Sequence, residues 1–132
     1  MAMANLSGRT LENVIEDALV RKGLTPGVHC ALDALSIFGK RIQVDVKIDP
    51  CLVFPTGLIV ESKWQDVGGS AEEKLPYLVM NIRLRYPYPT IIIIDGHGWS
   101  DGALAWLRAQ IDGHLLAVFS LKEFVSWLNR GI

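Results

Sequence analysis

The 132-residue sequence lacks several features that would place it in a specialised class of protein. Its two cysteines, Cys30 and Cys51, make neither a disulfide framework nor a metal-binding motif. The longest strongly apolar run, residues 91–94, is far too short to span a bilayer. Residues 1–8 lack the basic and apolar regions of a signal peptide. We therefore expect a cytoplasmic protein with no membrane segment.

The sequence also lacks an excess of positive charge, because 13 Lys and Arg are balanced by 14 Asp and Glu, a formal net charge of −1. A nucleic-acid-binding chain with this balance would need its basic side chains gathered on one face, or a second copy or partner to extend the surface. Hydrophobic residues make up 50% of the chain, which favours a folded globular protein. No repeat or linker is apparent, so we expect a single domain over residues 1–132.

Hydrophobic periodicity predicts a chain of helices and strands. Helices are expected at about residues 10–22, 70–84, 101–111 and 120–131, with capping boxes opening the second at Ser70–Glu73 and the fourth at Ser120–Glu123. Strands are expected at 41–48, 57–64, 90–95 and 115–119, whereas 28–38 is ambiguous. Early strands follow one another and later strands alternate with helices. This order predicts an α/β domain with a mixed sheet and helices on both faces.

Three polar side chains on two adjacent strands form the candidate site. Residues two apart on a strand point the same way, so Glu61 and Lys63 project side by side. If the strands pair, Asp45 converges on Glu61, and a hard divalent cation such as Mg²⁺ would relieve the repulsion between the carboxylates. A lysine beside that cation can hold or deprotonate the water that attacks phosphorus. We therefore expect phosphodiester hydrolysis, with Asp45 and Glu61 close enough to share one cation and Lys63 beside them.

Asp45 followed by Glu61-Ser62-Lys63-Trp64-Gln65 resembles the D…E-x-K-x-Q variant of the PD-(D/E)XK nuclease superfamily. The predicted elements are similar to its restriction-endonuclease-like core, αβββαβ, with a C-terminal αβα extension, so the resemblance covers nearly the whole chain. It implies a DNA endonuclease that uses Mg²⁺, with Mn²⁺ as a substitute. It also implies that Asp45, Glu61 and the backbone carbonyl of Ser62 are metal ligands and that Lys63 positions the water.

The resemblance extends to residues outside the central motif. Many members add a glutamate from the first helix, where Glu12 fits best and Glu16, one turn later, is the rival. Gln65 is expected to support the site and contact DNA, although a polar strand end is the alternative. The chain departs from the family pattern at Val44, which stands where a proline would precede Asp45. Asp49, before Pro50, competes weakly with Asp45 but lies at a turn.

Contacts to DNA are expected from the segment after the motif. Residues 68–77 resemble the corresponding segment of some type II restriction enzymes, which makes Ser70 and Lys74 candidates. Arg83 is a further candidate for a phosphate contact, and the alternative is that these side chains only solvate a helix. The three histidines show no metal-ligand spacing, so surface or core roles are expected for them.

Two other functions are open to this sequence. Gly98-Trp99-Ser100-Asp101-Gly102 fits the G-x-S-x-G pattern of a serine hydrolase, with Asp112 and His114 downstream, although Ser100 or Asp101 could equally cap a helix. The other alternative is a non-cleaving module that binds DNA or a partner on the nuclease fold.

The last expectation concerns assembly and partners. We expect a homo-oligomer, most simply a dimer, since cleavage of both strands of a duplex needs two active centres. A protein partner could also supply specificity. Large apolar residues on the third and fourth helices support a dimer, because a short chain may not bury all of them; they are Leu104, Trp106, Leu107, Phe124 and Trp127.

Overall fold

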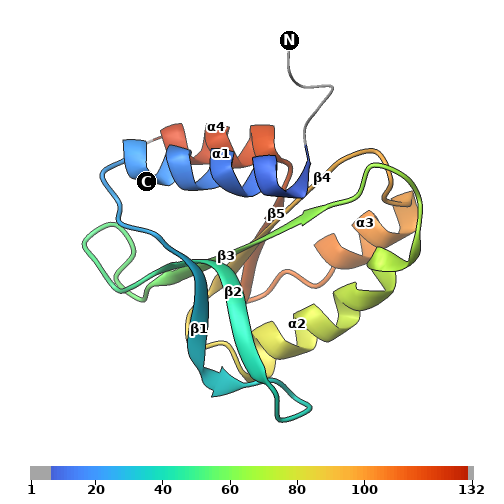
Figure 1. Ribbon diagram of the computed structural model, residues 1–132, viewed down its shortest axis with the longest axis horizontal. Coiled ribbons are helices and arrows are strands. Elements are labelled where there is room, and N and C mark those ends of the chain that lie inside the picture. Colours follow the sequence, from blue (N-terminus) through green and yellow to red (C-terminus); the bar gives the residue numbers. More distant parts are fainter. Residues whose placement is uncertain (1–6, 131–132) are drawn as a thin grey trace.

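A computed structural model describes residues 7–130, and it shows an α/β fold with one central sheet (Figure 1). The helices are α1 (Gly8–Arg21), the 3₁₀ helix η2 (Ser70–Lys74), α2 (Leu75–Leu84), α3 (Asp101–Arg108) and α4 (Leu121–Asn129). The strands are β1 (Gly27–Leu35), β2 (Arg41–Ile48), β3 (Leu58–Trp64), β4 (Thr90–Asp95) and β5 (Leu115–Phe119). None of the helices within residues 7–130 is long and apolar enough to cross a membrane.

The five strands lie in the sheet in the order in which they occur in the chain. β1, β2 and β3 pair antiparallel as a meander, whereas β3, β4 and β5 pair parallel through the crossover helices α2 and α3. The mixed sheet, the helices beside it and the order αβββαβ with αβα after it confirm the fold class expected from the sequence.

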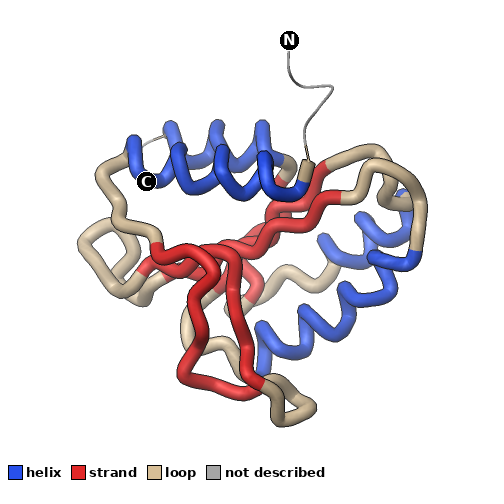
Figure 2. The backbone as a smooth tube through the Cα atoms, in the orientation of Figure 1, coloured by secondary structure: helices blue, strands red, loops and turns tan. Residues whose placement is uncertain are grey.

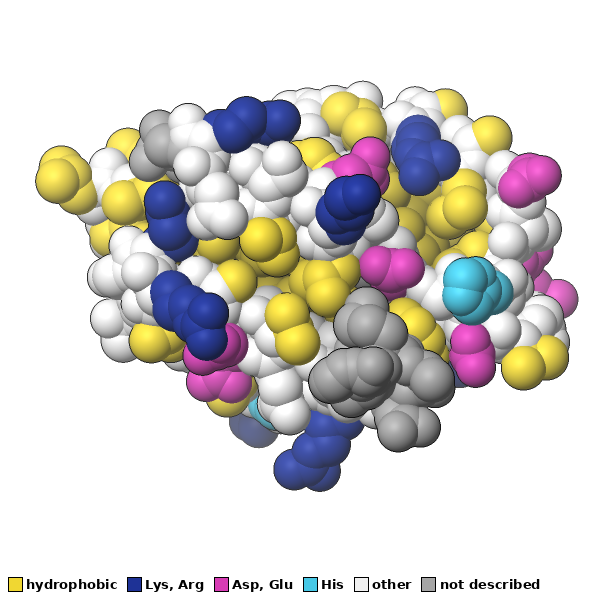
Figure 3. Space-filling model, turned by 90° about the horizontal axis from the view of Figure 1, so that it is seen from above, with side chains coloured by type: hydrophobic (Ala, Val, Ile, Leu, Met, Phe, Trp, Pro, Cys, Tyr) yellow, Lys and Arg dark blue, Asp and Glu magenta, His cyan; other side chains and the backbone are white. Residues whose placement is uncertain are grey.

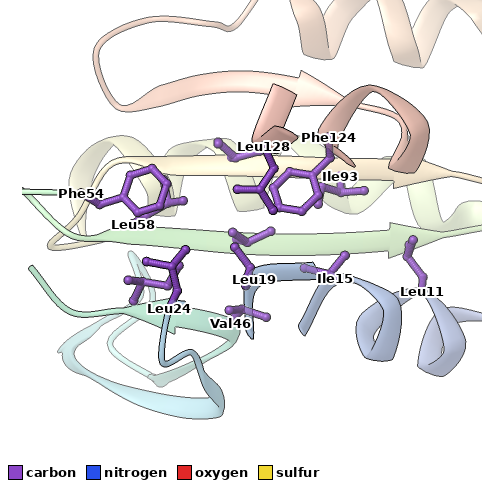
Figure 4. Close-up of a cluster of buried hydrophobic side chains, with 13 residues drawn as sticks. Leu11, Ile15, Leu19, Leu24, Val46, Phe54, Leu58, Ile93, Phe124 and Leu128 are labelled. Atoms are coloured by element: carbon purple, nitrogen blue, oxygen red, sulfur yellow. The ribbon is translucent and has the colours of Figure 1, made fainter. Parts of the chain in front are cut away.

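Helices cover both faces of the sheet: α1 and α4 lie side by side on one face, and α2 and α3 lie on the other (Figure 2). On the first face, α1 buries Leu11, Ile15 and Leu19 at helical spacing, and these side chains pack with Phe124 and Leu128 of α4 (Figure 4). Burial of such large apolar side chains is the main stabilising contribution here, at about 1.5–3 kcal/mol each.

The opposite face has its own core. The inner strand β4 is apolar on both sides, with Ile91 and Ile93 facing α1 and α4 while Ile92 and Ile94 face α2 and α3. Leu107 and Phe124 are fully buried inside the chain, and Leu104 and Trp127 are half-buried against the two cores. The expectation that the chain would not bury all of these residues alone therefore applies chiefly to Trp106, which is 39% exposed.

The strands expected at residues 41–48, 90–95 and 115–119 have those bounds in the structure, and the Ser120–Glu123 capping box is confirmed at the start of α4. The capping box expected at Ser70 was wrong, because the segment is 3₁₀ and Gly69 precedes it without a side-chain cap. Pro76 explains why the α-helix begins only at Leu75. A proline has no backbone N–H to donate within a helix, so it fits only in the first turn.

Candidate active site

The candidate site forms where β2 and β3 separate. The two strands pair over only three positions, ending at Val46 opposite Val60. Beyond this point β2 stays with β1 and bends away, while β3 continues along β4 (Figure 1). A fork of this kind leaves backbone N–H groups without their ladder partners, and buried N–H groups require acceptors. Asp45 and Glu61 are the next residues on the two arms of the fork.

The two carboxylates supply the missing acceptors. The backbone N–H of Asp45 donates to Glu61 Oε1 at 2.9 Å, and the backbone N–H of Ser62 donates to Asp45 Oδ2 at 2.8 Å. The Ser62 hydroxyl also donates to Asp45 Oδ2, at 3.3 Å. Each carboxylate therefore bonds to the opposite arm of the fork. The structure brings Asp45, Glu61 and Ser62 together through these hydrogen bonds.

Glu61 is the most buried acid of the site, with only 5% of its surface exposed. Its second oxygen, Oε2, accepts a hydrogen bond from the hydroxyl of Tyr86, the second residue after α2. Burial, and then the charge of Asp45, raise the pKa of Glu61 to about 7. Burial, and then the charge of Glu61, raise the pKa of Tyr86 above its ordinary range, so that this hydroxyl remains a donor. Glu61 is thus held rigidly in a position where either charge state is accessible near neutral pH.

A cleft of about 670 Å³ opens beside Asp45, between α1 and the strands β1 and β2. Glu12, next to the buried Leu11, reaches it from α1, and His29 reaches it from β1. The ligand atoms of Glu12, His29 and Asp45 all lie within 4.8 Å of one another. Burial and the charge of Asp45 raise the pKa of Glu12, as expected for acids that converge on one point.

This group of side chains fits a divalent cation. Two carboxylates and an imidazole offer oxygen and nitrogen ligands from three different elements, and the cleft leaves space in front of them. Glu61 is not in the group, because its oxygens bond to Asp45 and Tyr86 instead. Asp45 and Glu61 are therefore neighbours at the fork through carboxylate-to-backbone hydrogen bonds, whereas the cluster suited to a cation forms on the side of Glu12.

Lys63 and Gln65 continue along β3 from Glu61. Lys63 is half-buried, and its positive charge opposes, as the smallest contribution, the rise that burial and Asp45 cause in the pKa of both Glu61 and Glu12. Gln65 lies beyond the site: its side-chain amide donates to the carbonyl of Gly98 at 2.8 Å. The observed role of Gln65 is thus to attach the end of β3 to the loop after β4.

The competing acids lie further out. Glu16 lines the same cleft one turn along α1 from Glu12, but it is outside the group of converging ligand atoms. Asp49 accepts from the Tyr88 hydroxyl at 3.1 Å and pairs with Lys47 at 3.4 Å. The geometry therefore favours Glu12 over Glu16, and Asp45 over Asp49.

The three candidates for DNA contact differ in their freedom. Ser70 and Lys74 are exposed at the two ends of η2. Arg83 is engaged within the chain: its Nε donates to Asp112 Oδ2 at 2.9 Å and its Nη2 donates to the carbonyl of Gln110 at 2.8 Å. Arg83 therefore ties α2 to the loop before β5, and a contact with phosphate would require these bonds to break.

Ser100 takes the structural role that the sequence allowed for it. Its hydroxyl accepts from the N–H of Ala103 as the N-cap of α3 and donates to Glu72 at 3.0 Å. The carboxylate of Asp112 bonds to Arg83 and to the backbone of residues 114 and 115. Within residues 7–130, neither side chain hydrogen-bonds to an imidazole. The arrangement of a serine hydrolase is therefore not formed.

The segment before Ser100 is shaped by close backbone approach. A Cβ atom on Gly96, which has a φ of +97°, would lie 2.3 Å from the carbonyl oxygen of Gln65. A Cβ on Gly98 would lie 2.5 Å from the carbonyl oxygen of Val67. The glycines let this loop pack against the end of β3, which explains Gly98, the first glycine of the G-x-S-x-G pattern, without a nucleophile.

Sequence reasoning missed two residues, His29 and Tyr86. His29 follows Glu12 by 17 positions in a segment whose secondary structure was ambiguous, so its spacing carried no signal. Tyr86 lies outside any motif, between α2 and β4. A cross-strand register would have found His29, since β1 and β2 place it opposite Asp45, between the pairs Val28–Val46 and Cys30–Val44.

The mixed five-stranded sheet flanked by helices, with acids on both arms of its fork, is consistent with a restriction-endonuclease-like fold. The sequence matches the PD-(D/E)XK nuclease superfamily domain over residues 3–132, and the chain belongs to this superfamily. No curated protein matches the chain. Membership implies nuclease activity in general, and nucleases of this superfamily typically use divalent metals.

Proposed function

We propose that this chain is a divalent-metal-dependent endonuclease that hydrolyses phosphodiester bonds in DNA. The main support is the convergence of Glu12 and Asp45 on one cleft, with Glu61 and Lys63 at the adjacent fork. Mg²⁺ is the expected cation and Mn²⁺ its substitute. Glu12 and Asp45 would hold the cation, and the family motif adds Glu61 and the carbonyl of Ser62 as ligands.

A bound cation would neutralise the negative charge that accumulates on the phosphate during hydrolysis. Asp45 is already oriented for this site, because both donors of Ser62 bond to its Oδ2. Lys63 would hold the attacking water and keep a positive charge beside the phosphate. Tyr86 holds Glu61 in place from behind, so the carboxylate does not need to be ordered when substrate binds.

Cleavage assays on DNA of different shapes test this proposal. Linear, nicked, branched and single-stranded DNAs are incubated with the protein and Mg²⁺ or Mn²⁺, and EDTA serves as the blank. Asp45→Asn and Lys63→Ala should lose cleavage by at least about a hundredfold while retaining the far-UV spectrum. Lys122→Ala is the matched control, since this lysine is exposed on α4. Metal-independent binding of DNA without cleavage of any substrate would instead indicate a non-cleaving module.

We also propose that the active species is a homodimer. On the face formed by α1 and α4, basic side chains are dispersed among acidic ones (Figure 3), so one copy offers little concentrated positive charge there. Two copies would provide both a longer surface for phosphates and two centres for the two strands. Light scattering with and without DNA tests this, and a monomer that cuts both strands would refute it.

A further inference from the structure

His29 on β1 lies next to Asp45 on the neighbouring strand β2. The register of β1 and β2 places these residues opposite each other, between the pairs Val28–Val46 and Cys30–Val44. His29 Nε2 also lies 3.3 Å from Glu12 Oε1, which extends from α1 over the same point. An imidazole nitrogen is thus presented at the centre where the two carboxylates meet.

The backbone at His29 is held in an unusual conformation. Its φ is 50°, which makes it the one positive-φ residue other than glycine among residues 7–130. The side-chain amide of Gln43 donates to the His29 carbonyl at 2.7 Å and secures this turn of the strand. This conformation sets the position of the His29 Cβ atom and so the direction in which the imidazole leaves the strand.

We propose that His29 is a direct ligand of the cation that Glu12 and Asp45 hold, and that the site therefore binds Mn²⁺ more tightly than Mg²⁺. The inference rests on the proposed metal-dependent function. It follows from the donor set: Mg²⁺ strongly prefers oxygen ligands, whereas Mn²⁺ and the later transition metals accept an imidazole nitrogen more readily. The three ligand atoms already lie within 4.8 Å of one another, so a single ion can contact all of them.

Metal binding without DNA separates this inference from catalysis. Continuous-wave EPR measures free Mn²⁺ in titrations of the protein, and pulsed EPR detects coupling between bound Mn²⁺ and a directly bonded nitrogen. The wild-type protein should show this nitrogen coupling, and Mg²⁺ should displace Mn²⁺ only in large excess. His29→Gly, which removes the imidazole and accepts a positive φ, should abolish the coupling and weaken Mn²⁺ binding at least about tenfold.

Three further variants complete the test. His29→Asn keeps a side chain that tolerates positive φ, so it replaces His29→Gly if that variant fails to fold, and it should also lose the nitrogen coupling. His97→Ala, at an exposed histidine, is the matched control and should retain it. Asp45→Asn should lose Mn²⁺ binding whichever residues complete the site.

The results distinguish the two levels of the argument. Mn²⁺ binding that depends on Asp45 but shows no nitrogen coupling, or coupling that persists in both His29 variants, would overturn the role of His29 and leave the nuclease proposal intact. Equal affinity for Mg²⁺ and Mn²⁺ would likewise overturn the stated preference. Absence of any Mn²⁺ binding that depends on Asp45 would refute both the role of His29 and the metal site on which it rests.

Discussion

The buried carboxyl of Glu61 should make the protein less stable as the pH rises, and replacement by glutamine should remove this effect. In Glu61→Gln, the amide oxygen can still accept from the N–H of Asp45, and the amide N–H₂ can donate to the Tyr86 hydroxyl. The substitution therefore keeps the shape and hydrogen bonds of the site but removes a charge that burial makes costly.

The magnitude follows from the pKa of Glu61, which rises from an ordinary value of 4.5 to about 7 in the folded protein. The folded state binds the proton more tightly than the unfolded state, so folding takes up a proton between these two values. Stability is therefore fully present below about pH 4.5 and falls as the pH rises to about 7. The loss amounts to about 3 kcal/mol, because each pKa unit corresponds to about 1.4 kcal/mol.

Urea unfolding in EDTA at a series of pH values from 5 to 8 measures the effect. The difference in unfolding free energy between Glu61→Gln and wild type should increase with pH in favour of the variant, reaching about 3 kcal/mol at pH 8. Glu73→Gln, at an exposed position on η2, is the matched control and should show no such trend. A constant difference for Glu61→Gln across this range would refute the argument that burial raises this pKa. Cleavage should be lost in the same variant, since a stabilising change at a functional site removes the group that the chemistry needs.

Three other substitutions test separate parts of the structure. Tyr86→Phe removes the hydrogen-bond donor to Glu61. We therefore expect the free energy of unfolding, measured with urea at pH 8, to fall by about 1–2 kcal/mol and the pKa of Glu61 to rise further. Gly96→Ala should lower the free energy of unfolding by at least about 2 kcal/mol, because Gly96 has a positive φ and an added Cβ would meet the Gln65 carbonyl. Gly113→Ala should leave the unfolding free energy almost unchanged, because an added Cβ there has no atom nearby. Ser100→Ala should lower the free energy of unfolding by about 1 kcal/mol, because α3 loses its N-cap, and should leave DNA cleavage unchanged. Loss of a measured esterase activity in this variant would instead support the serine hydrolase function.

The sequence predicted strands best where the side-chain pattern was decisive. β2 alternates cleanly between buried and more exposed positions, and β4 is a continuous apolar run, so both were found with their observed bounds. β1 was ambiguous because it is an edge strand that buries only Leu32, and exposed strands carry no hydrophobic period. The start of α2 was misplaced because a local capping pattern at Ser70 was outweighed by the requirements of Pro76.

The residues of the candidate site were predictable where the alternation of side chains along a strand and the family motif indicated the same positions. Asp45, Glu61 and Lys63 follow from two adjacent strands, whereas Glu12 was suggested only by the resemblance to the family, with Glu16 as its rival. The direction of the Glu61 carboxylate was not predictable, since it depends on Tyr86, which the chain brings back 25 residues later. His29 was missed for a related reason: its neighbour Asp45 is close only through the register of β1 and β2.

The fork between β2 and β3 explains why fold and chemistry coincide at these residues. The cleft that a phosphate and a cation would need lies beside the fork at Asp45, and separation of the strands leaves the N–H groups of Asp45 and Ser62 without ladder partners. Carboxylates at these positions satisfy both requirements, since Asp45 and Glu61 accept the orphaned N–H bonds and remain available as acids. An amide at either position can still accept the N–H bond but carries no charge. The substitutions Asp45→Asn and Glu61→Gln should therefore keep the fork while losing the electrostatics, which makes them better probes of the site than alanine, whose methyl group would leave the opposing N–H without a partner.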